Sequence, residues 1–98
     1  MIDLEPSFLD EVKRILHEHA GGIEVRAFGS RINGTARRFS DLDLALVSKE
    51  QIDWRQMEAL KDAFAESNLP LQVDVLDWHT LSDSFRKIIE TSYEVILE

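Results

Sequence analysis

The sequence lacks cysteine altogether, and it contains only two prolines, four glycines and fewer basic than acidic residues. Without cysteine the chain has neither a disulfide framework nor a thiol nucleophile. No apolar run approaches the roughly 20 residues of a membrane-spanning helix. The opening Met-Ile-Asp-Leu-Glu-Pro also lacks the basic segment and apolar core of a signal peptide. We therefore expect a cytoplasmic protein that does not enter a membrane.

Basic residues are scarce, with 11 Lys and Arg against 19 Asp and Glu, and the net charge is −8. Affinity for a polynucleotide comes mainly from Lys and Arg that neutralise its phosphates, so direct polynucleotide binding is not expected. The positive charge is concentrated instead in one stretch, at Arg26, Arg31, Arg37 and Arg38. An acidic body with a local group of arginines suits a nucleotide and a basic protein partner.

The length of 98 residues and the absence of repeats or linkers predict a single domain spanning residues 1–98. Helical periodicity marks residues 7–16, 53–67 and a last helix from about residue 82, with a short helix at 31–36. The second long helix is expected to bury Trp54, Met57, Leu60 and Phe64, and the last one Phe85, Ile88 and Ile89. Strand-like runs occupy residues 23–28, 41–47 and 71–76. The fold class is therefore α/β (α+β), with a small mixed sheet, flanking helices and the order α-β-α-β-α-β-α; the tail 93–97 is either helix or edge strand.

A Gly29-Ser30 pair ends the first predicted strand, and Asp41 and Asp43 follow ten residues later at the start of the second. Glycine lets a ligand approach the backbone closely, and the amides that open a helix face anions. Two acids at i and i+2 in a strand leave the same face, and paired carboxylates suit the two ions of a phosphoryl-transfer site. Each piece alone is ordinary turn chemistry, but their combination between two strands favours a phosphate cradle joined to a metal site.

A third acid, Asp74, lies in the third predicted strand, on the face opposite Val73 and Val75. An acid among β-branched strand residues needs a metal or a basic partner. Asp77 competes for this role, but its place at the strand's end favours a cap for the next helix. The three acids meet if the first two strands are antiparallel and the second and third are parallel.

This pattern of Gly29-Ser30, Asp41-Leu42-Asp43 and a later strand acid at Asp74 resembles the minimal nucleotidyltransferases, the MNT branch of the DNA polymerase β superfamily. The likeness extends over residues 69–78 and 84–89 and covers the chain from Gly22 onward. It implies a nucleotidyltransferase that uses ATP and two Mg²⁺ ions. Catalysis and metal binding would fall to Asp41, Asp43 and Asp74, and nucleotide binding to Gly29, Ser30, Arg31 and Arg37.

The resemblance also implies a partner and an acceptor. MNT proteins are antitoxins that transfer AMP from ATP to a tyrosine hydroxyl on a HEPN-domain toxin, an RNase, which predicts a hetero-oligomer with the toxin or a homo-oligomer. One alternative is transfer to a small hydroxyl compound such as an aminoglycoside. The other is a binding module that neutralises its partner by complex formation alone, with the acids as a relic.

Overall fold

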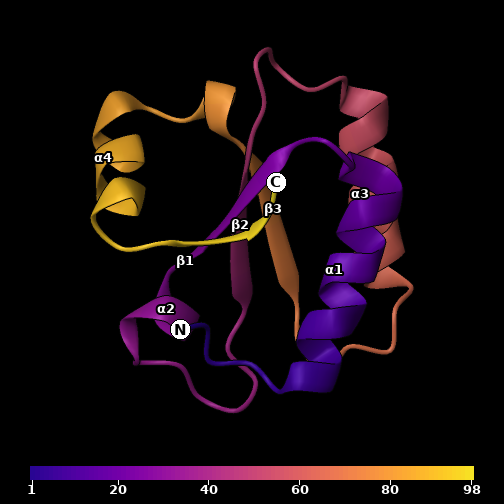
Figure 1. Ribbon diagram of the computed structural model, residues 1–98, viewed down its shortest axis with the longest axis vertical. Coiled ribbons are helices and arrows are strands. Elements are labelled where there is room, and N and C mark those ends of the chain that lie inside the picture. The colour runs from indigo at the N-terminus through magenta and orange to yellow at the C-terminus, as the bar shows by residue number, and fades with distance from the viewer.

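The computed structural model describes all 98 residues and is built on one four-stranded mixed β-sheet (Figure 1). The strand order is β3-β2-β1-β4. The strands are β1 (Glu24–Phe28), β2 (Leu42–Val47), β3 (Val73–Asp77) and β4 (Glu94–Leu97). β1 runs antiparallel to both β2 and β4, whereas β2 and β3 are parallel. The pairing predicted for the first three strands is thus confirmed.

Helices lie on both faces of the sheet. Figure 1 shows α1 (Pro6–Ala20) beside α3 (Trp54–Ala65) on one side and α4 (Asp83–Thr91) on the other. The short α2 (Ser30–Asn33) follows β1, and a 3-10 helix, η1 (Trp78–Thr80), follows β3. Local sequence explains where α3 and α4 begin, because a capping residue precedes each helix. The Asp53 side chain accepts a hydrogen bond from the Arg55 amide at the start of α3, and the Ser82 side chain accepts one from the Phe85 amide at the start of α4.

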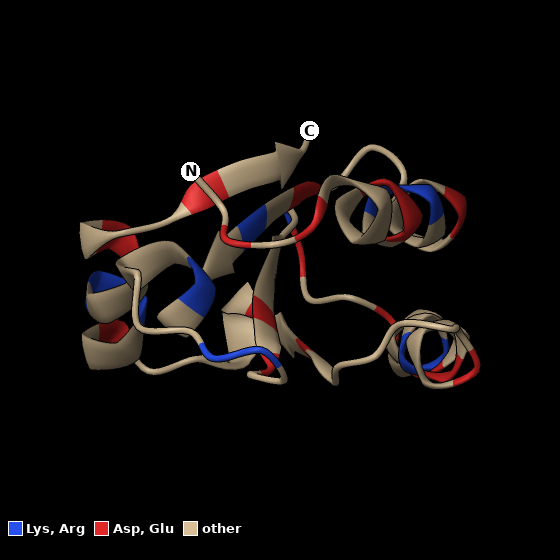
Figure 2. Ribbon diagram, turned by 90° about the horizontal axis from the view of Figure 1, so that it is seen from below, with Lys and Arg blue, Asp and Glu red and all other residues tan.

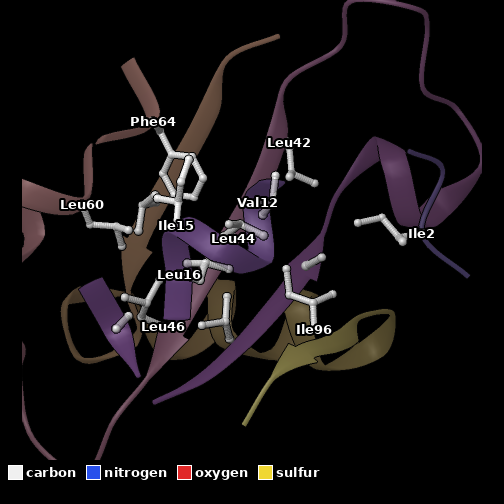
Figure 3. Close-up of a cluster of buried hydrophobic side chains, with 14 of the residues drawn as sticks. Ile2, Val12, Ile15, Leu16, Leu42, Leu44, Leu46, Leu60, Phe64 and Ile96 are labelled. Carbon is white, nitrogen blue, oxygen red and sulfur yellow. The ribbon is translucent and has the colours of Figure 1, made fainter. Parts of the chain in front are cut away.

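The alternating pattern of β2 divides the core into two clusters. Leu42, Leu44 and Leu46 are fully buried on the face covered by α1 and α3, where they meet side chains from those helices (Figure 3). The opposite face carries a smaller cluster of Phe28 and Ala45 packed against Ile89 of α4. Because successive strand residues point to opposite faces, Asp43 lies on the α4 side. The core therefore decides which face carries the acid.

The structure corrects several element boundaries. Of the two alternatives left open for the tail 93–97, the strand is correct, because Glu94–Leu97 forms β4 at the edge of the sheet beside β1. α1 begins at Pro6 and continues to Ala20, β2 begins at Leu42, and α2 is only four residues long because Gly34 takes a left-handed conformation after it. None of the helices is both long and apolar enough to cross a bilayer.

Two side chains predicted to be buried are exposed, Trp54 by 70% and Ile88 by 63%. Trp54 is the first residue of α3, and the Arg55 guanidinium lies 5.6 Å from its ring centroid. Helical periodicity identifies the apolar face of a helix, but it does not show whether the packing partner of that face reaches the helix end at which Trp54 lies. Ile88 precedes the buried Ile89, and consecutive helical residues point about 100° apart, so only one of the two faces the sheet.

Candidate active site

The two strand acids stand side by side on adjacent parallel strands. Asp43 of β2 is paired in register with Asp74 of β3 and, across the antiparallel side, with Phe28 of β1. Neighbouring strands lie about 4.8 Å apart, so the two carboxylates leave the same sheet face as close neighbours. They line a cavity of about 1040 Å³ that also includes Gly29 and Asn33 and is walled on one side by α4 residues.

Gly29 lies beside Asp43, one member of this acid pair. It has φ +81° and ψ −153°, a backbone conformation open essentially only to glycine. A Cβ built at this position would lie 2.4 Å from Oδ2 of Asp43. Since β1 ends opposite Asp43, the backbone leaves the strand over the carboxylate. Glycine is therefore required here both for the turn and for the space that the Asp43 side chain fills.

The electrostatics of the site favour a cation. Burial raises the pKa of Asp43 above its usual range, and the nearby charges of Asp74 and Asp41 raise it further. None of the ion pairs in the structure involves these three acids. The only side-chain hydrogen bond to any of them comes from Gln72, whose Nε2 donates to Oδ1 of Asp74 over 2.8 Å. A bound cation would remove the repulsion that this arrangement leaves.

The donor chemistry fits a hard divalent ion such as Mg²⁺, because carboxylate oxygens are its preferred protein ligands. The arrangement is not a closed cage, since no three His, Cys, Asp or Glu side chains converge closely enough to hold a metal by themselves. Magnesium in phosphoryl-transfer sites takes only one or two carboxylates, with phosphate oxygens of the substrate and water as the other ligands. An acid pair with a third carboxylate nearby meets that requirement.

The other predicted site residues lie around this centre. Asp41 is exposed one residue before β2, near enough to act on the charge of Asp43. Ser30 is the first residue of α2, where the leading amides of a helix have no intrahelical acceptor. Arg37 is exposed in the loop between α2 and β2. Gly29, Asp43 and Asp74 line the cavity, whereas Ser30, Asp41 and Arg37 do not.

Arg31 departs from the prediction. Its side chain is only 5% exposed, and its guanidinium donates to the backbone carbonyls of Asp3, Arg37, Arg38 and Ser40. Residue 31 is outside the cavity that contains the acids. Successive side chains of a helix point about 100° apart, so the residues of the four-residue α2 face in different directions. The sequence does not show which of them faces the proposed phosphate site. The guanidinium is thus committed to the loop and not to a ligand.

Sequence reasoning overlooked several polar residues of the cavity, among them Asn33, Lys61 and Gln72. Gln72 has a recognisable signal, because it lies two residues before Asp74 and so on the same side of an extended chain. Asn33 and Lys61 come from α2 and α3, and only the packing of these helices brings them to the same cavity. Asp77, by contrast, does what was predicted, since its Oδ1 accepts from the His79 amide at the start of η1.

A sequence profile places the fold in a known family. The profile described as "Polymerase beta, Nucleotidyltransferase" matches residues 10–98, which include most of α1 and every later element through β4. The chain belongs to the polymerase β nucleotidyltransferase family. This nucleotidyltransferase is 47% identical over 97 residues to a probable protein adenylyltransferase, MntA, from Haemophilus influenzae, and the match covers 99% of the chain and 85% of that protein.

Solved structures show the same nucleotidyltransferase fold. A toxin–antitoxin crystal structure with AMP-PNP matches with a TM-score of 0.67 and 22% identity, over 90% of this chain and 71% of that one. A complex of a tri-AMPylated Shewanella oneidensis HEPN toxin with an MNT antitoxin matches with a TM-score of 0.59 and 17% identity, over 90% and 67%. At these identities the likeness concerns the fold alone.

Proposed function

We propose that this nucleotidyltransferase transfers AMP from ATP to a tyrosine hydroxyl of a HEPN-domain toxin and so acts as its antitoxin. The observation that carries the proposal is the pairing of Asp43 with Asp74 on adjacent parallel strands, facing a cavity in which Gly29 leaves no room for a side chain beside Asp43. The 47% identity to a probable protein adenylyltransferase supports a protein acceptor. We also propose that the reaction takes place in the cytoplasm, where ATP is available.

In the proposed reaction the acceptor oxygen attacks the α-phosphorus of ATP, a new P–O bond forms, and the bond to the β-phosphate oxygen breaks. Pyrophosphate leaves with the electron pair, and the hydroxyl proton passes to a base. We propose Asp74 as that base, with the hydrogen bond that Gln72 donates to its carboxylate as the contact that would orient it. Asp41 and Asp43 would hold Mg²⁺ together with Asp74, and the bound ion would neutralise charge on the phosphates.

The backbone at Gly29 and the Ser30 amide and hydroxyl are proposed to bind the phosphates, with Arg37 as an additional charge from the loop. Arg31 is removed from this set because its donors already bind backbone carbonyls. The α4 wall of the cavity adds Phe85, Ile88 and Ile89 as an apolar surface beside the acids. Most of the rate would come from positioning and charge neutralisation.

Intact-mass spectrometry tests the proposal. The chain is incubated with ATP, Mg²⁺ and its HEPN partner, and the partner's mass should rise by AMP units. Asp74→Asn should still bind the partner but transfer about 10²–10⁴ times more slowly. Asp43→Asn should lose transfer as well, whereas Asp62→Asn, an exposed change on α3, should retain it.

Two other outcomes would replace the proposal. A partner that is silenced without any gain in mass would show an antitoxin that acts by complex formation alone. AMP transfer to an aminoglycoside or another small hydroxyl compound, with the toxin left unmodified, would show a small-molecule nucleotidyltransferase. Full activity of Asp43→Asn at ordinary Mg²⁺ would remove the acid pair from the mechanism.

A further inference from the structure

Arg31 is a buried cation with no acidic partner. Its side chain is 5% exposed, and none of the ion pairs in the structure includes it. A buried guanidinium is tolerated only when its N–H groups find acceptors. Here Nε and Nη2 both donate to the Ser40 carbonyl, over 3.0 and 2.8 Å. Nη2 also donates to Arg38 O over 3.2 Å, and Nη1 donates to Asp3 O over 2.8 Å.

Apart from Asp3, these acceptors belong to the loop between α2 and β2, which has few hydrogen bonds of its own. Residues 37–39 are exposed, and the hydrogen bonds within the loop join only Arg37 and Ser40, from the Arg37 amide to Ser40 Oγ and from the Ser40 amide to the Arg37 carbonyl. Asp41 follows Ser40 directly, and β2 begins one residue later. The guanidinium therefore holds the backbone immediately before the first acid of the site.

The same side chain joins the loop to the N-terminal segment. The Asp3 amide donates to the Arg31 carbonyl over 2.7 Å, while the Arg31 guanidinium donates back to the Asp3 carbonyl. The neighbouring Ile2 is buried in the main core cluster. Through these bonds the loop is tied to a fixed part of the molecule.

We propose that Arg31 is a positioning residue for nucleotidyl transfer. Its planar guanidinium binds the carbonyls of Arg37, Arg38 and Ser40, which fixes the backbone that leads into Asp41, and it does not touch the substrate. Lysine cannot replace this function, because an ammonium group lacks the rigid fork that reaches several carbonyls at once. A phosphate ligand would behave differently, because an ammonium binds phosphate well as a point charge.

The loop contains its own reporter, since trypsin cleaves after Arg37 and Arg38. We expect Arg31→Lys and Arg31→Met to increase native-state cleavage at these two sites by at least about tenfold, because local opening governs proteolysis. Arg14→Met is the matched control, an exposed arginine on α1 that pairs with Glu11 and Glu18. It should leave cleavage of the loop unchanged. Equal cleavage in wild type and both Arg31 variants would overturn the proposal.

The kinetic test rests on the proposed nucleotidyl transfer. Both Arg31 variants should lower kcat with little change in the KM for ATP, and higher Mg²⁺ should restore part of the loss. A raised KM that Arg31→Lys rescues would show a direct phosphate contact and overturn the positioning role. If wild type transfers nothing to any acceptor, the proposed function fails, while the trypsin result still decides whether Arg31 orders the loop.

A second variant covers the case in which Arg31→Met does not fold. Ser40→Ala removes the bond from the Arg37 amide to Ser40 Oγ and leaves the guanidinium contacts in place. Because Arg31 holds the loop, cleavage after Arg37 and Arg38 should then rise less than about twofold. A loop opened fully by Ser40→Ala alone would show that the serine orders it, and would overturn the role given to Arg31.

Discussion

At the scale of single residues, the candidate site depends on one contact between a glycine and an acid. Gly29 combines positive φ with a Cβ position 2.4 Å from Asp43 Oδ2, so any side chain there displaces the carboxylate. Gly34 has the same φ of +81°, but nothing lies within 4 Å of the Cβ it would carry. A substitution at Gly34 therefore tests the effect of backbone strain alone, whereas the same substitution at Gly29 adds a clash with Asp43.

We predict that Gly29→Ala and Gly34→Ala each lose about 1–3 kcal/mol of unfolding free energy, because both force a side chain onto a left-handed backbone. Only Gly29→Ala should also lose nucleotide transfer, by at least about tenfold, since it alone meets Asp43. Chemical denaturation and a transfer assay measure the two effects. Equal transfer activity of the two variants would show that Gly29 is not part of the active site.

The raised pKa of Asp43 makes a second prediction at this scale. A carboxyl group whose pKa is higher in the folded than in the unfolded state destabilises the fold. This effect grows as pH rises from the unfolded-state pKa and is complete above the folded-state pKa. Asp43→Asn should therefore raise the melting temperature at pH 7 in EDTA, and the gain should shrink as pH falls through the folded pKa toward the usual range of Asp. Asp62→Asn serves as the control.

Magnesium should reverse the order of melting temperatures of wild type and Asp43→Asn. Wild type should gain thermal stability when Mg²⁺ replaces EDTA, because the cation binds the folded state, and Asp43→Asn should gain less. A wild-type melting temperature that does not respond to millimolar Mg²⁺, together with no gain from Asp43→Asn, would show that the acids neither repel one another nor bind the ion.

At the scale of elements, Asp77 connects β3 to two neighbouring segments. Its carboxylate is 6% exposed and accepts from the amides of Ile52 and His79, over 2.8 and 3.0 Å. Ile52 belongs to the segment between β2 and α3, so the acid at the end of β3 also fixes how the chain approaches α3. Asp77 and Asp74 are three residues apart in one strand and face opposite sides of the sheet.

We predict that Asp77→Ala destabilises the fold by about 1–3 kcal/mol, because it leaves buried amides without an acceptor. Asp53→Ala, which removes the exposed cap of α3, should cost about 1 kcal/mol. Urea unfolding compares the two. ATP affinity of the folded Asp77→Ala protein should be unchanged; a large drop in affinity would mean that this end of β3 also takes part in the site.

At the scale of the whole molecule, the two faces of the sheet differ in role, since one packs the main hydrophobic core and the other carries the acid pair. One face is closed by α1 and α3, and the other is only partly covered by α4, so the acid pair keeps an open cavity beside it. Figure 2 shows acidic residues spread over several elements, on helices as well as strands, in keeping with the net charge of −8. A basic partner is the natural complement of this surface.

Association with the proposed HEPN partner should therefore depend on salt. We predict that the association rate falls at least about tenfold between roughly 0.05 and 0.5 M NaCl, because attraction between opposite net charges is screened. The dissociation rate should change much less. Stopped-flow mixing or surface plasmon resonance provides both rates. An association rate that does not vary with salt would rule out steering by net charge.

The sequence was sufficient for the pairing of the first three strands, which followed from the need for Asp41, Asp43 and Asp74 to meet, and for the cap that Asp77 provides to η1. Alternation in Leu42-Asp43-Leu44 assigns the acid to one face, and a Gly-Ser between two strands marks a turn that admits a ligand. These features rest on periods and residue types that act within a few positions of the chain.

Tertiary structure decided the remaining features. The tail became β4 because the free edge of β1 was available to pair with it. Burial of Ile89 and exposure of Ile88 followed from where α4 meets the sheet. Arg31 stands next to Gly29-Ser30 in sequence, yet its guanidinium donates to the carbonyls of Asp3, Arg37, Arg38 and Ser40, which local spacing does not bring together. A side chain's partners depend on long-range packing, whereas the sequence alone determines its chemistry and its strand face.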